Sequence, residues 1–336
     1  MEDFIHSFLN RSLKSDEFKI FSLAGDASTR RYYRIVLAHQ SWVLMRWDPF
    51  NPENYPFLSV LKHFAKAGVH VPEVMAMAPQ DGLVLLEDLG DLTLERKFWE
   101  SQSQEISLDF YKMAIDEIVK IHHKATETPG NCTAFDIKFD TEKFLWEMNY
   151  GNDNLIEGVL KFKLTPTSSK DLQKIFIDIC AKLDKEPKKI AHRDFHSRNL
   201  MIKLDEMMVI DFQDARLGPI QYDLVSLFKD SYVNLNDEMT QNLMSYYLDS
   251  SKDFLPDNFS REHFDEIYEL QSVQRCFKAC GSFASFFNLR NDRRYLKYLS
   301  GTLKRVLKSL TEFPEYKFFA DILIDSGALE RKYETL

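Results

Sequence analysis

The sequence predicts an α+β fold of two lobes, in which a small antiparallel-sheet lobe precedes a larger and mostly helical lobe. Three observations carry this prediction. Short β-leaning runs separated by turn residues fill 18–87, apolar stripes at helical spacing follow (110–121 and 222–232), and one β island at 190–210 lies between them. The change of pattern places the lobe boundary after residue 88, so the lobes cover 1–88 and 89–336.

The first lobe is expected to be a sheet with a few helices. Its β-leaning runs are 18–23, 32–37, 42–47, 73–78 and 83–87. Pro79 to Gly82 separate the last two runs with residues that favour a tight turn. One helix is expected over 3–13, before the sheet, and a second over 54–67, where Gly68 ends the apolar stripe.

The β island of the second lobe is predicted to be a hairpin. Residues 200–203 and 207–210 are apolar runs on either side of three turn residues. A register that pairs position 203 with 207 sets Asn199 beside Asp211 at the open end of the hairpin. Neighbouring strands lie about 4.8 Å apart, so the two side chains can hold one cation between them.

Three polar residues around this hairpin form a candidate catalytic group. Asn199 and Asp211 offer an amide oxygen and a carboxylate, which are hard ligands of the kind that Mg²⁺ prefers. Asp194 lies five residues before Asn199 on the loop that enters the hairpin and can face the same spot. The plain alternative, turn formers and caps, explains each residue alone better than it explains three at this spacing.

The wider segment has the kinase pattern H-R-D-x-x-x-x-N, from His192 to Asn199, followed by an Asp at the end of a strand. A protein kinase is nevertheless disfavoured. Gln213 stands where Asp211-Phe212 would be followed by glycine, and 218–223 leads at once into a helix, without room for an activation loop.

Matching motifs extend well beyond this segment. They comprise 23–28 with 30–32, 43–45, 86–91, 192–201, 211–230 and 274–278, within about residues 20–300. With these motifs the chain resembles the aminoglycoside phosphotransferase and choline kinase-like superfamily, which phosphorylates small molecules. Within that superfamily it is most similar to the bacterial N-acetylmuramate/N-acetylglucosamine anomeric kinases of peptidoglycan recycling. The resemblance implies a bilobal protein-kinase-like fold.

The resemblance also implies an ATP- and Mg²⁺-dependent transfer of the γ-phosphate to the 1-hydroxyl of an amino sugar. In that chemistry Asp194 is the catalytic base, and Asn199 and Asp211 hold the metal. The implied rivals are an aminoglycoside, choline or homoserine kinase. A catalytically silent nucleotide-binding module is the rival from another class of protein.

Two segments are implied to bind the nucleotide. The loop Gly25-Asp26-Ala27-Ser28 would lie over the phosphates, with Arg30 directly after it. Glu87 to Leu89 would meet the adenine through backbone groups of the hinge between the lobes.

The pattern departs from other kinases at one position. Met45 stands on the third strand where a lysine usually pairs with the nucleotide phosphates. Either an arginine (Arg46, or one of Arg30, Arg31 and Arg34) supplies the missing charge, or the ATP site is built differently, as the resemblance suggests. Strand alternation turns Arg46 away if Met45 faces inward, so we favour Arg30, Arg31 or Arg34.

Acceptor binding is expected to involve a cation, because the lactyl group of N-acetylmuramate carries a carboxylate. The candidates on the later helices are Arg275, Lys278, Arg290, Arg293 and Arg294. Near the catalytic loop, His196, Arg198 and Asp230 are further candidates for substrate binding.

Composition narrows the partners and the location. The net charge is −9, which opposes attraction to nucleic acid or to an anionic membrane. Only 11 glycines are present, and neither a dinucleotide-binding nor a P-loop motif occurs. Four scattered cysteines, an acidic start and the lack of a long apolar run favour a cytoplasmic protein. The resemblance implies a small-molecule amino-sugar substrate. The oligomeric state stays open.

Overall fold

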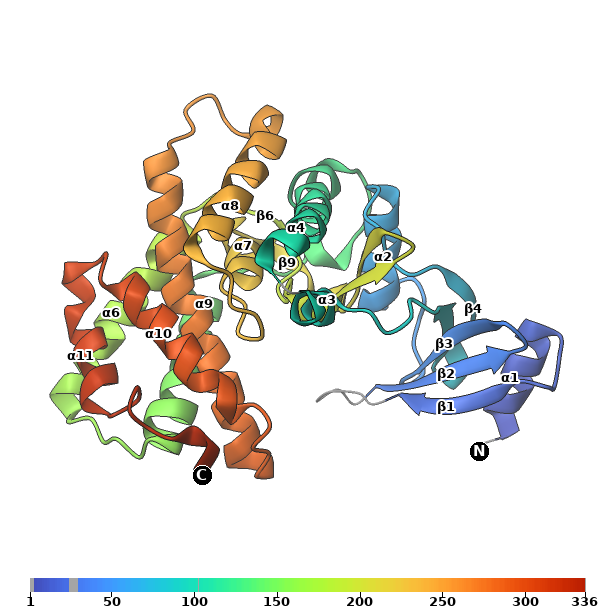
Figure 1. Cartoon of the computed structure of the whole chain (residues 1–336), viewed down its shortest axis with the longest axis horizontal. Helices are drawn as coiled ribbons and strands as arrows, with labels where there is room; N and C mark the ends of the chain where they lie inside the picture. The colour runs from blue at the N-terminus through green and yellow to red at the C-terminus, as the bar shows by residue number, and fades with distance from the viewer. Residues whose placement is uncertain (1–2, 24–29, 102, 336) are drawn as a thin grey trace.

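A computed structural model describes residues 3–23, 30–101 and 103–335 of the chain. The N-terminal sheet forms one end of the molecule and the helices after β5 form the other, with a narrow connection between them (Figure 1). The predicted fold class, a small antiparallel-sheet lobe followed by a mostly helical one, is therefore confirmed. None of the described helices has both the length and the apolarity needed to cross a membrane.

The first lobe is a five-stranded antiparallel sheet with the order β1-β2-β3-β5-β4. Its strands are β1 (Lys19–Leu23), β2 (Arg31–Leu37), β3 (Gln40–Arg46), β4 (Val74–Ala78) and β5 (Leu83–Glu87). Helix α1 (Asp3–Leu13) covers one face, where Phe8 and Leu9 pack against Ile35, Leu44 and Leu85. All the elements expected in this lobe are present within one or two residues.

The other face of the sheet points toward the helical lobe. Helix α2 (Pro56–Lys66) begins at Pro56 and is followed by Gly68 in the left-handed conformation (φ 81°), as its sequence predicts. This helix packs on the second lobe, where the Phe57 ring stacks on Phe212 with centroids 5.3 Å apart. In Figure 1, α2 accordingly lies beside α4 and away from the sheet.

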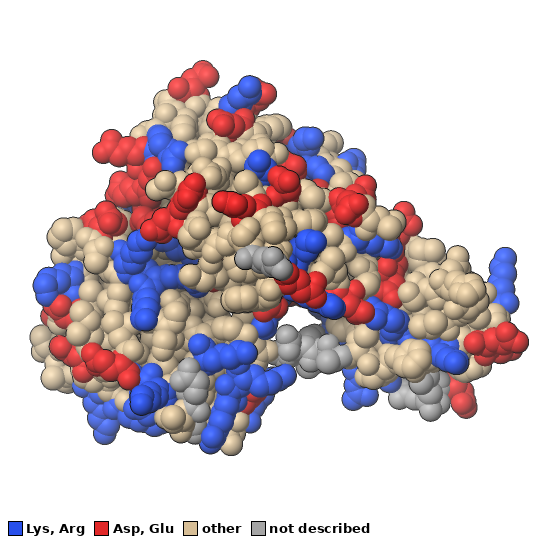
Figure 2. Space-filling view, in the orientation of Figure 1, with Lys and Arg blue, Asp and Glu red and all other residues tan. Residues whose placement is uncertain are grey.

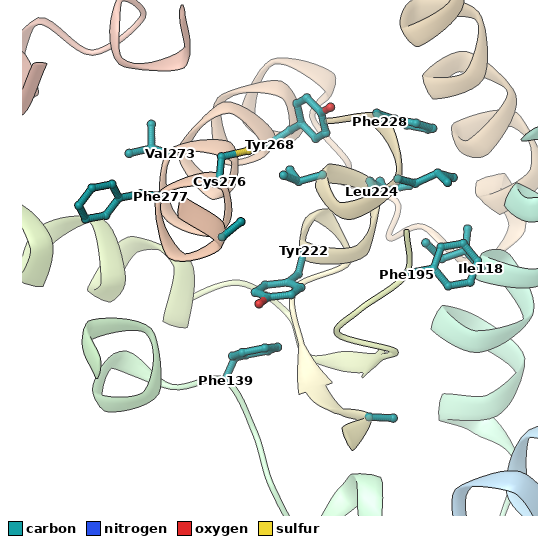
Figure 3. Packing of buried hydrophobic residues seen from close by; sticks show 14 of the residues in the cluster. Ile118, Phe139, Phe195, Tyr222, Leu224, Phe228, Tyr268, Val273, Cys276 and Phe277 are labelled. Carbon is teal, nitrogen blue, oxygen red and sulfur yellow. The ribbon is translucent and has the colours of Figure 1, made fainter. Parts of the chain in front are cut away.

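The second lobe is built around one long helix, α9 (Arg261–Arg290), which packs against α5, α7 and α10. The other helices are α3 (Leu94–Glu100), α4 (Gln104–Val119), α5 (Thr141–Gly151), α6 (Pro166–Asp184), α7 (Gln221–Phe228), α8 (Asp237–Ser251), α10 (Leu299–Leu310) and α11 (Lys317–Asp325). Figure 3 shows Tyr222 of α7 between Phe139 and the α9 side chains; the Phe139 and Tyr222 rings stack 4.3 Å apart. This apolar core holds the elements that carry the site.

Two glycines set the crossing of α5 and α9. A Cβ on Gly281 would lie 2.6 Å from the Cα of Gly151, closer than packed atoms approach. The contact brings the two helix backbones together and places Glu147, one turn before Gly151, opposite Gln274 of α9.

The predicted hairpin is present as β7 (Leu200–Lys203) and β8 (Glu206–Val209), but its predicted register is wrong by one residue. Lys203 pairs with Glu206 rather than with Met207. Leu204 and Asp205 both adopt positive φ, 49° and 61°, so the connection is a two-residue turn instead of three residues. Two short strands, β6 (Lys189–Ala191) and β9 (Arg216–Gly218), pair beside it.

Candidate active site

One buried carboxylate, that of Asp223, binds the backbone of the loop that follows β6. Asp223 of α7 is fully buried and accepts hydrogen bonds from the backbone N–H of His192 (2.6 Å) and of Arg193 (2.9 Å). Arg193 has φ 82°, a strained conformation that these two bonds help to stabilise. Behind Asp223 lies His122 at 3.3 Å, which in turn bonds the hydroxyl of Tyr247 at 2.8 Å. Asp223 thus acts as a structural support of this loop.

The same loop brings the three predicted catalytic residues together. The amide nitrogen of Asn199 donates to the backbone carbonyl of Asp194 at 2.9 Å and lies 3.4 Å from the carboxylate of Asp211. Asp211 has a left-handed backbone (φ 65°) at the end of β8, and Gln213 donates to its other oxygen at 2.8 Å. Asn199 and Asp211 stay close although the hairpin register is shifted by one residue. The Ile210 N–H donates to the Asn199 carbonyl, and Asp211 is the residue after Ile210.

The surroundings shift the pKa values of Asp194 and Asp211 in opposite directions. Burial alone would raise the pKa of Asp194, but the positive charges of Lys278 and Arg193 outweigh it and hold that pKa well below the usual range. Burial raises the pKa of Asp211, and the negative charge of Asp194 adds to the effect. Asp194 is therefore ionised at neutral pH, and Asp211 lies where a neighbouring cation would be favourable.

The chemistry of this donor set fits Mg²⁺. The nitrogen of the Asn199 amide donates to the Asp194 carbonyl and lies 3.4 Å from Asp211, so the amide oxygen and the Asp211 carboxylate are the groups that could act as ligands. Among the described residues, no cluster of three or more His, Cys, Asp or Glu side chains could hold a metal. Two protein ligands completed by phosphates and water suit Mg²⁺, which keeps much of its shell outside the protein.

A cavity of about 710 Å³ lies between the sheet and the β7–β8 hairpin. Leu23, Val43 and Leu86 form its apolar wall on the sheet side, and Met201 and Ile210 form the opposite wall. The hinge that joins the lobes closes one side, with lining residues Glu87, Asp88, Leu89, Gly90 and Asp91. Two apolar walls and a backbone edge match a flat base, and Asn199 and Asp211 lie in the same cavity.

Comparisons with known proteins agree with this geometry. Residues 20–258 match the phosphotransferase enzyme family, APH, over well more than half of the chain. The chain belongs to this family. It is thus a phosphotransferase that uses ATP, and the prediction of a kinase is confirmed.

Curated relatives carry a narrower name. The chain is 30% identical over 318 residues to an N-acetylmuramate/N-acetylglucosamine kinase of Neisseria meningitidis, covering 92% of both chains. A protein of the same name from Pseudomonas aeruginosa is 27% identical and is covered over 88% of its length, with 91% of this chain matched. The resemblance stated from the sequence is therefore confirmed.

Solved structures show the same fold at low sequence identity. A choline/ethanolamine kinase family protein from Mesorhizobium loti superposes with a TM-score of 0.62 at 16% identity, covering 96% of this chain and 98% of that one. The ADP-bound aminoglycoside phosphotransferase APH(2'')-Ib gives 0.58 at 17% identity, covering 92% and 97%.

The residues expected to bind the nucleotide have mixed outcomes in this phosphotransferase. Gly25, Asp26, Ala27 and Ser28 lie outside the described residues. Glu87 and Leu89 line the cavity, and the Leu89 side chain packs on the hairpin. Their contact with adenine stays a prediction.

The second-strand arginines divide between the two faces of the sheet. Arg31 pairs in register with Arg46, whose guanidinium lies 5.4 Å from the Phe4 ring on the α1 side, as expected. Arg30 lies beside Tyr32, which lines the cavity, and its guanidinium is 5.2 Å from the Trp47 ring. Met45 is fully buried in the core on the cavity side and leaves no room for a charge.

Arg34 also faces the cavity, but its charge is committed to the hinge. Its guanidinium donates to Asp88 at 3.0 Å, to Asp91 at 2.9 Å and to the Gly90 carbonyl at 3.1 Å. This clamp across the hinge was missed from the sequence because its partners lie more than 50 residues from Arg34.

Arg198 and Asp230 are held mainly by other protein groups. Arg198 makes two bonds of 2.9 Å to Glu95, and its guanidinium lies 3.6 Å from the Tyr232 ring centre. Asp230 is buried and accepts from the N–H and hydroxyl of Ser197 and from the Tyr232 N–H. Both residues thus shape the end of the catalytic loop, and their contact with an acceptor stays a prediction.

His196 lies between this cluster and Asp194. Burial lowers its pKa to about 4 although Asp230 and Asp194 pull it upward, so the ring is neutral at pH 7. Its ring packs edge-on against Tyr232, with centroids 5.3 Å apart. A direct role in substrate binding stays a prediction here as well.

Two candidates for acceptor binding, Arg275 and Lys278, lie on α9 near the catalytic loop. Arg275 is buried and donates to the Ser226 hydroxyl at 2.6 Å. Lys278 follows three residues later on the same face, where its charge acts on Asp194. Glu147 of α5, which the sequence did not single out, lies buried beside them and accepts from Gln274 at 3.0 Å. A single glutamate in a helix gives no signal that it is buried.

Proposed function

We propose that this protein transfers the γ-phosphate of ATP to the anomeric 1-hydroxyl of an N-acetylated amino sugar, N-acetylmuramate or N-acetylglucosamine. The observation that carries the proposal is the meeting of Asp194, Asn199 and Asp211 beside the inter-lobe cavity. The names of the curated relatives support the choice of acceptor.

In this mechanism, the Asp194 carboxylate accepts a hydrogen bond from the acceptor hydroxyl and orients it toward the γ-phosphorus. The hydroxyl oxygen forms the new P–O bond, the bond to the β-phosphate oxygen breaks, and ADP leaves. The hydroxyl proton passes to Asp194. Because neighbouring cations keep the pKa of Asp194 low, its main contribution is orientation by a full negative charge.

Asn199 and Asp211 would hold Mg²⁺, which neutralises charge on the transferring phosphate. Asp223 keeps the loop in its strained shape through the N–H groups of His192 and Arg193. Together these residues would fix the base and the metal ligands before the substrates bind.

We keep residue 88 as the proposed boundary between the two lobes, because the hinge residues on either side of it line the cavity between the lobes.

An acceptor panel tests the proposal. ADP release is measured with N-acetylmuramate, N-acetylglucosamine, choline, homoserine and kanamycin, and the product is analysed by ³¹P NMR. Turnover with an amino sugar and an anomeric phosphate signal is expected. Phosphate on another oxygen, or turnover only with an amino alcohol or an aminoglycoside, would contradict the proposed acceptor; ATP binding without any turnover would favour a silent module.

A further inference from the structure

The helical lobe presents a positively charged wall to the inter-lobe hollow although the whole chain has a net charge of −9. Figure 2 shows Lys and Arg side chains gathered on the helical lobe along the hollow between the lobes. A wall of this sign attracts an acceptor that carries a negative charge of its own.

Lys278 differs from the other acceptor candidates on α9 and in the segment that follows it. Arg275 is bonded to Ser226. Arg290 and Arg294 are exposed; Arg290 lies 5.7 Å from the Phe286 ring, and Arg294 is paired with Asp292 at 2.8 Å. Within the described part of the chain, the Lys278 ammonium forms neither an ion pair nor a side-chain hydrogen bond.

The helix geometry directs Lys278 at the reaction centre. Gln274 contacts Glu147 of α5, and Arg275 contacts Ser226 of α7. Lys278 lies three and four residues after them, which is the spacing of one helix face. Its ammonium is the strongest of the positive charges acting on Asp194, the residue proposed to orient the acceptor hydroxyl.

A buried and unpaired ammonium is costly, because burial removes water from the charge. Lys278 is partly buried, and this burial lowers its pKa while Asp194 and Glu147 act to raise it. Glu147 forms neither a hydrogen bond nor an ion pair with Lys278: Gln274 donates to its Oε2, and its Oε1, which has no hydrogen-bond partner among the described residues, lies 3.8 Å from Lys143. The missing partner is most simply an anionic group of the substrate.

We infer that Lys278 binds the carboxylate of the acceptor and makes the enzyme prefer an amino sugar with an acidic side arm, such as N-acetylmuramate, over the neutral N-acetylglucosamine. This inference rests on the proposed function. The Lys278–carboxylate bond would fix the acceptor while Asp194 orients its hydroxyl. An unpaired buried ammonium in the complex with the neutral sugar would penalise that substrate.

The test compares the two sugars in the unaltered protein and in Lys278→Met. For N-acetylmuramate, kcat/KM should fall about 10- to 100-fold, mainly through KM, as expected for losing one charge-assisted hydrogen bond. N-acetylglucosamine has no carboxylate to lose as a partner, so its kcat/KM should fall by a much smaller factor or rise, and the readout is the ratio of the two kcat/KM values; thermal melting reports that the variant is folded. Lys304→Met, an exposed lysine on α10, is the matched control and should leave both values unchanged.

The outcomes separate this inference from the proposed function. If the unaltered protein phosphorylates neither sugar, the proposed function fails. If it phosphorylates N-acetylglucosamine at least as well as N-acetylmuramate, or if Lys278→Met lowers both sugars equally, the role of Lys278 is refuted while the kinase activity stands.

Discussion

His123 gives the structure a measurable sensitivity to acid. It lies in the π-helical turn Lys120–Ala125, is 1% exposed, and stacks on Phe254 with ring centroids 4.7 Å apart. Neither ring nitrogen has a hydrogen-bond partner among the described residues. Burial, with smaller contributions from His122 and Lys189, lowers its pKa from 6.5 to about 3.

The sign of the pH effect follows from this shift. Above pH 6.5 the ring is neutral in both folded and unfolded chains. Below pH 6.5 the unfolded chain binds a proton at this histidine, whereas the folded protein does so only near pH 3. The free energy of unfolding therefore decreases as the pH is lowered from 6.5 to about 3. At pH 5, about 1.5 units below the pKa of the histidine in the unfolded chain, protonation of the unfolded state lowers the free energy of unfolding by roughly 2 kcal/mol.

The variant His123→Phe keeps the stacking and removes the titration. At pH 7.5 it should be as stable as the unaltered protein or slightly more so, because two unpartnered polar atoms disappear. On lowering the pH to 5, it should lose about 2 kcal/mol less. With roughly 2.1 cal/mol/K of unfolding entropy per residue over 336 residues, this corresponds to about 3 °C in Tm.

Thermal melting by circular dichroism at pH 7.5 and 5.0 measures the difference. His39→Phe, which removes an exposed histidine, serves as the control and should follow the unaltered protein at both pH values. An acid-induced drop in Tm of the same size in His123→Phe and in the unaltered protein would refute the reasoning.

Three further substitutions test the site and its support. Asp194→Asn should lower kcat by about 10²–10⁴-fold in the ADP-release assay while ATP affinity, measured by calorimetry, stays nearly constant; retained turnover would exclude it as the base. Asp211→Asn should raise the Mg²⁺ concentration needed for half-maximal turnover, and an unchanged Mg²⁺ curve would contradict its role as a ligand. Gly281→Ala places a Cβ 2.6 Å from the Gly151 Cα and should cost about 1–3 kcal/mol of stability in denaturant melts, whereas Gly301→Ala, which meets nothing within 4 Å, should not; equal stability would refute the close crossing.

The catalytic group could be predicted because its members are close in sequence. Asp194, Asn199 and Asp211 lie on one loop and one hairpin, so strand spacing alone brings them together. The register was missed because the turn at Leu204 and Asp205 needs positive φ at two residues other than glycine. Neither residue is a strong signal for such a turn.

The surroundings of the site could not be predicted because their partners are distant in sequence. Arg198 meets Glu95 across 103 residues and Tyr298 across 100. No periodicity or spacing reports such a pair, and an arginine next to a catalytic loop is equally typical of a substrate contact. Only the packing of α3 against the loop decides that this guanidinium is held inside the protein.

The missing lysine of the third strand is explained by the packing of the sheet. Met45 is fully buried in the apolar core on the cavity side of the sheet, where an ammonium would lose its water without a partner. Arg34, the nearest substitute by sequence, is neutralised by Asp88 and Asp91 and so fixes the hinge instead. Among the described sheet residues considered for the missing charge, Arg30 alone combines a place beside the cavity-lining Tyr32 side chain with a place outside that clamp. The phosphates would then be neutralised chiefly by the metal at Asn199 and Asp211, which makes the helical lobe, rather than the sheet, the main source of charge stabilisation.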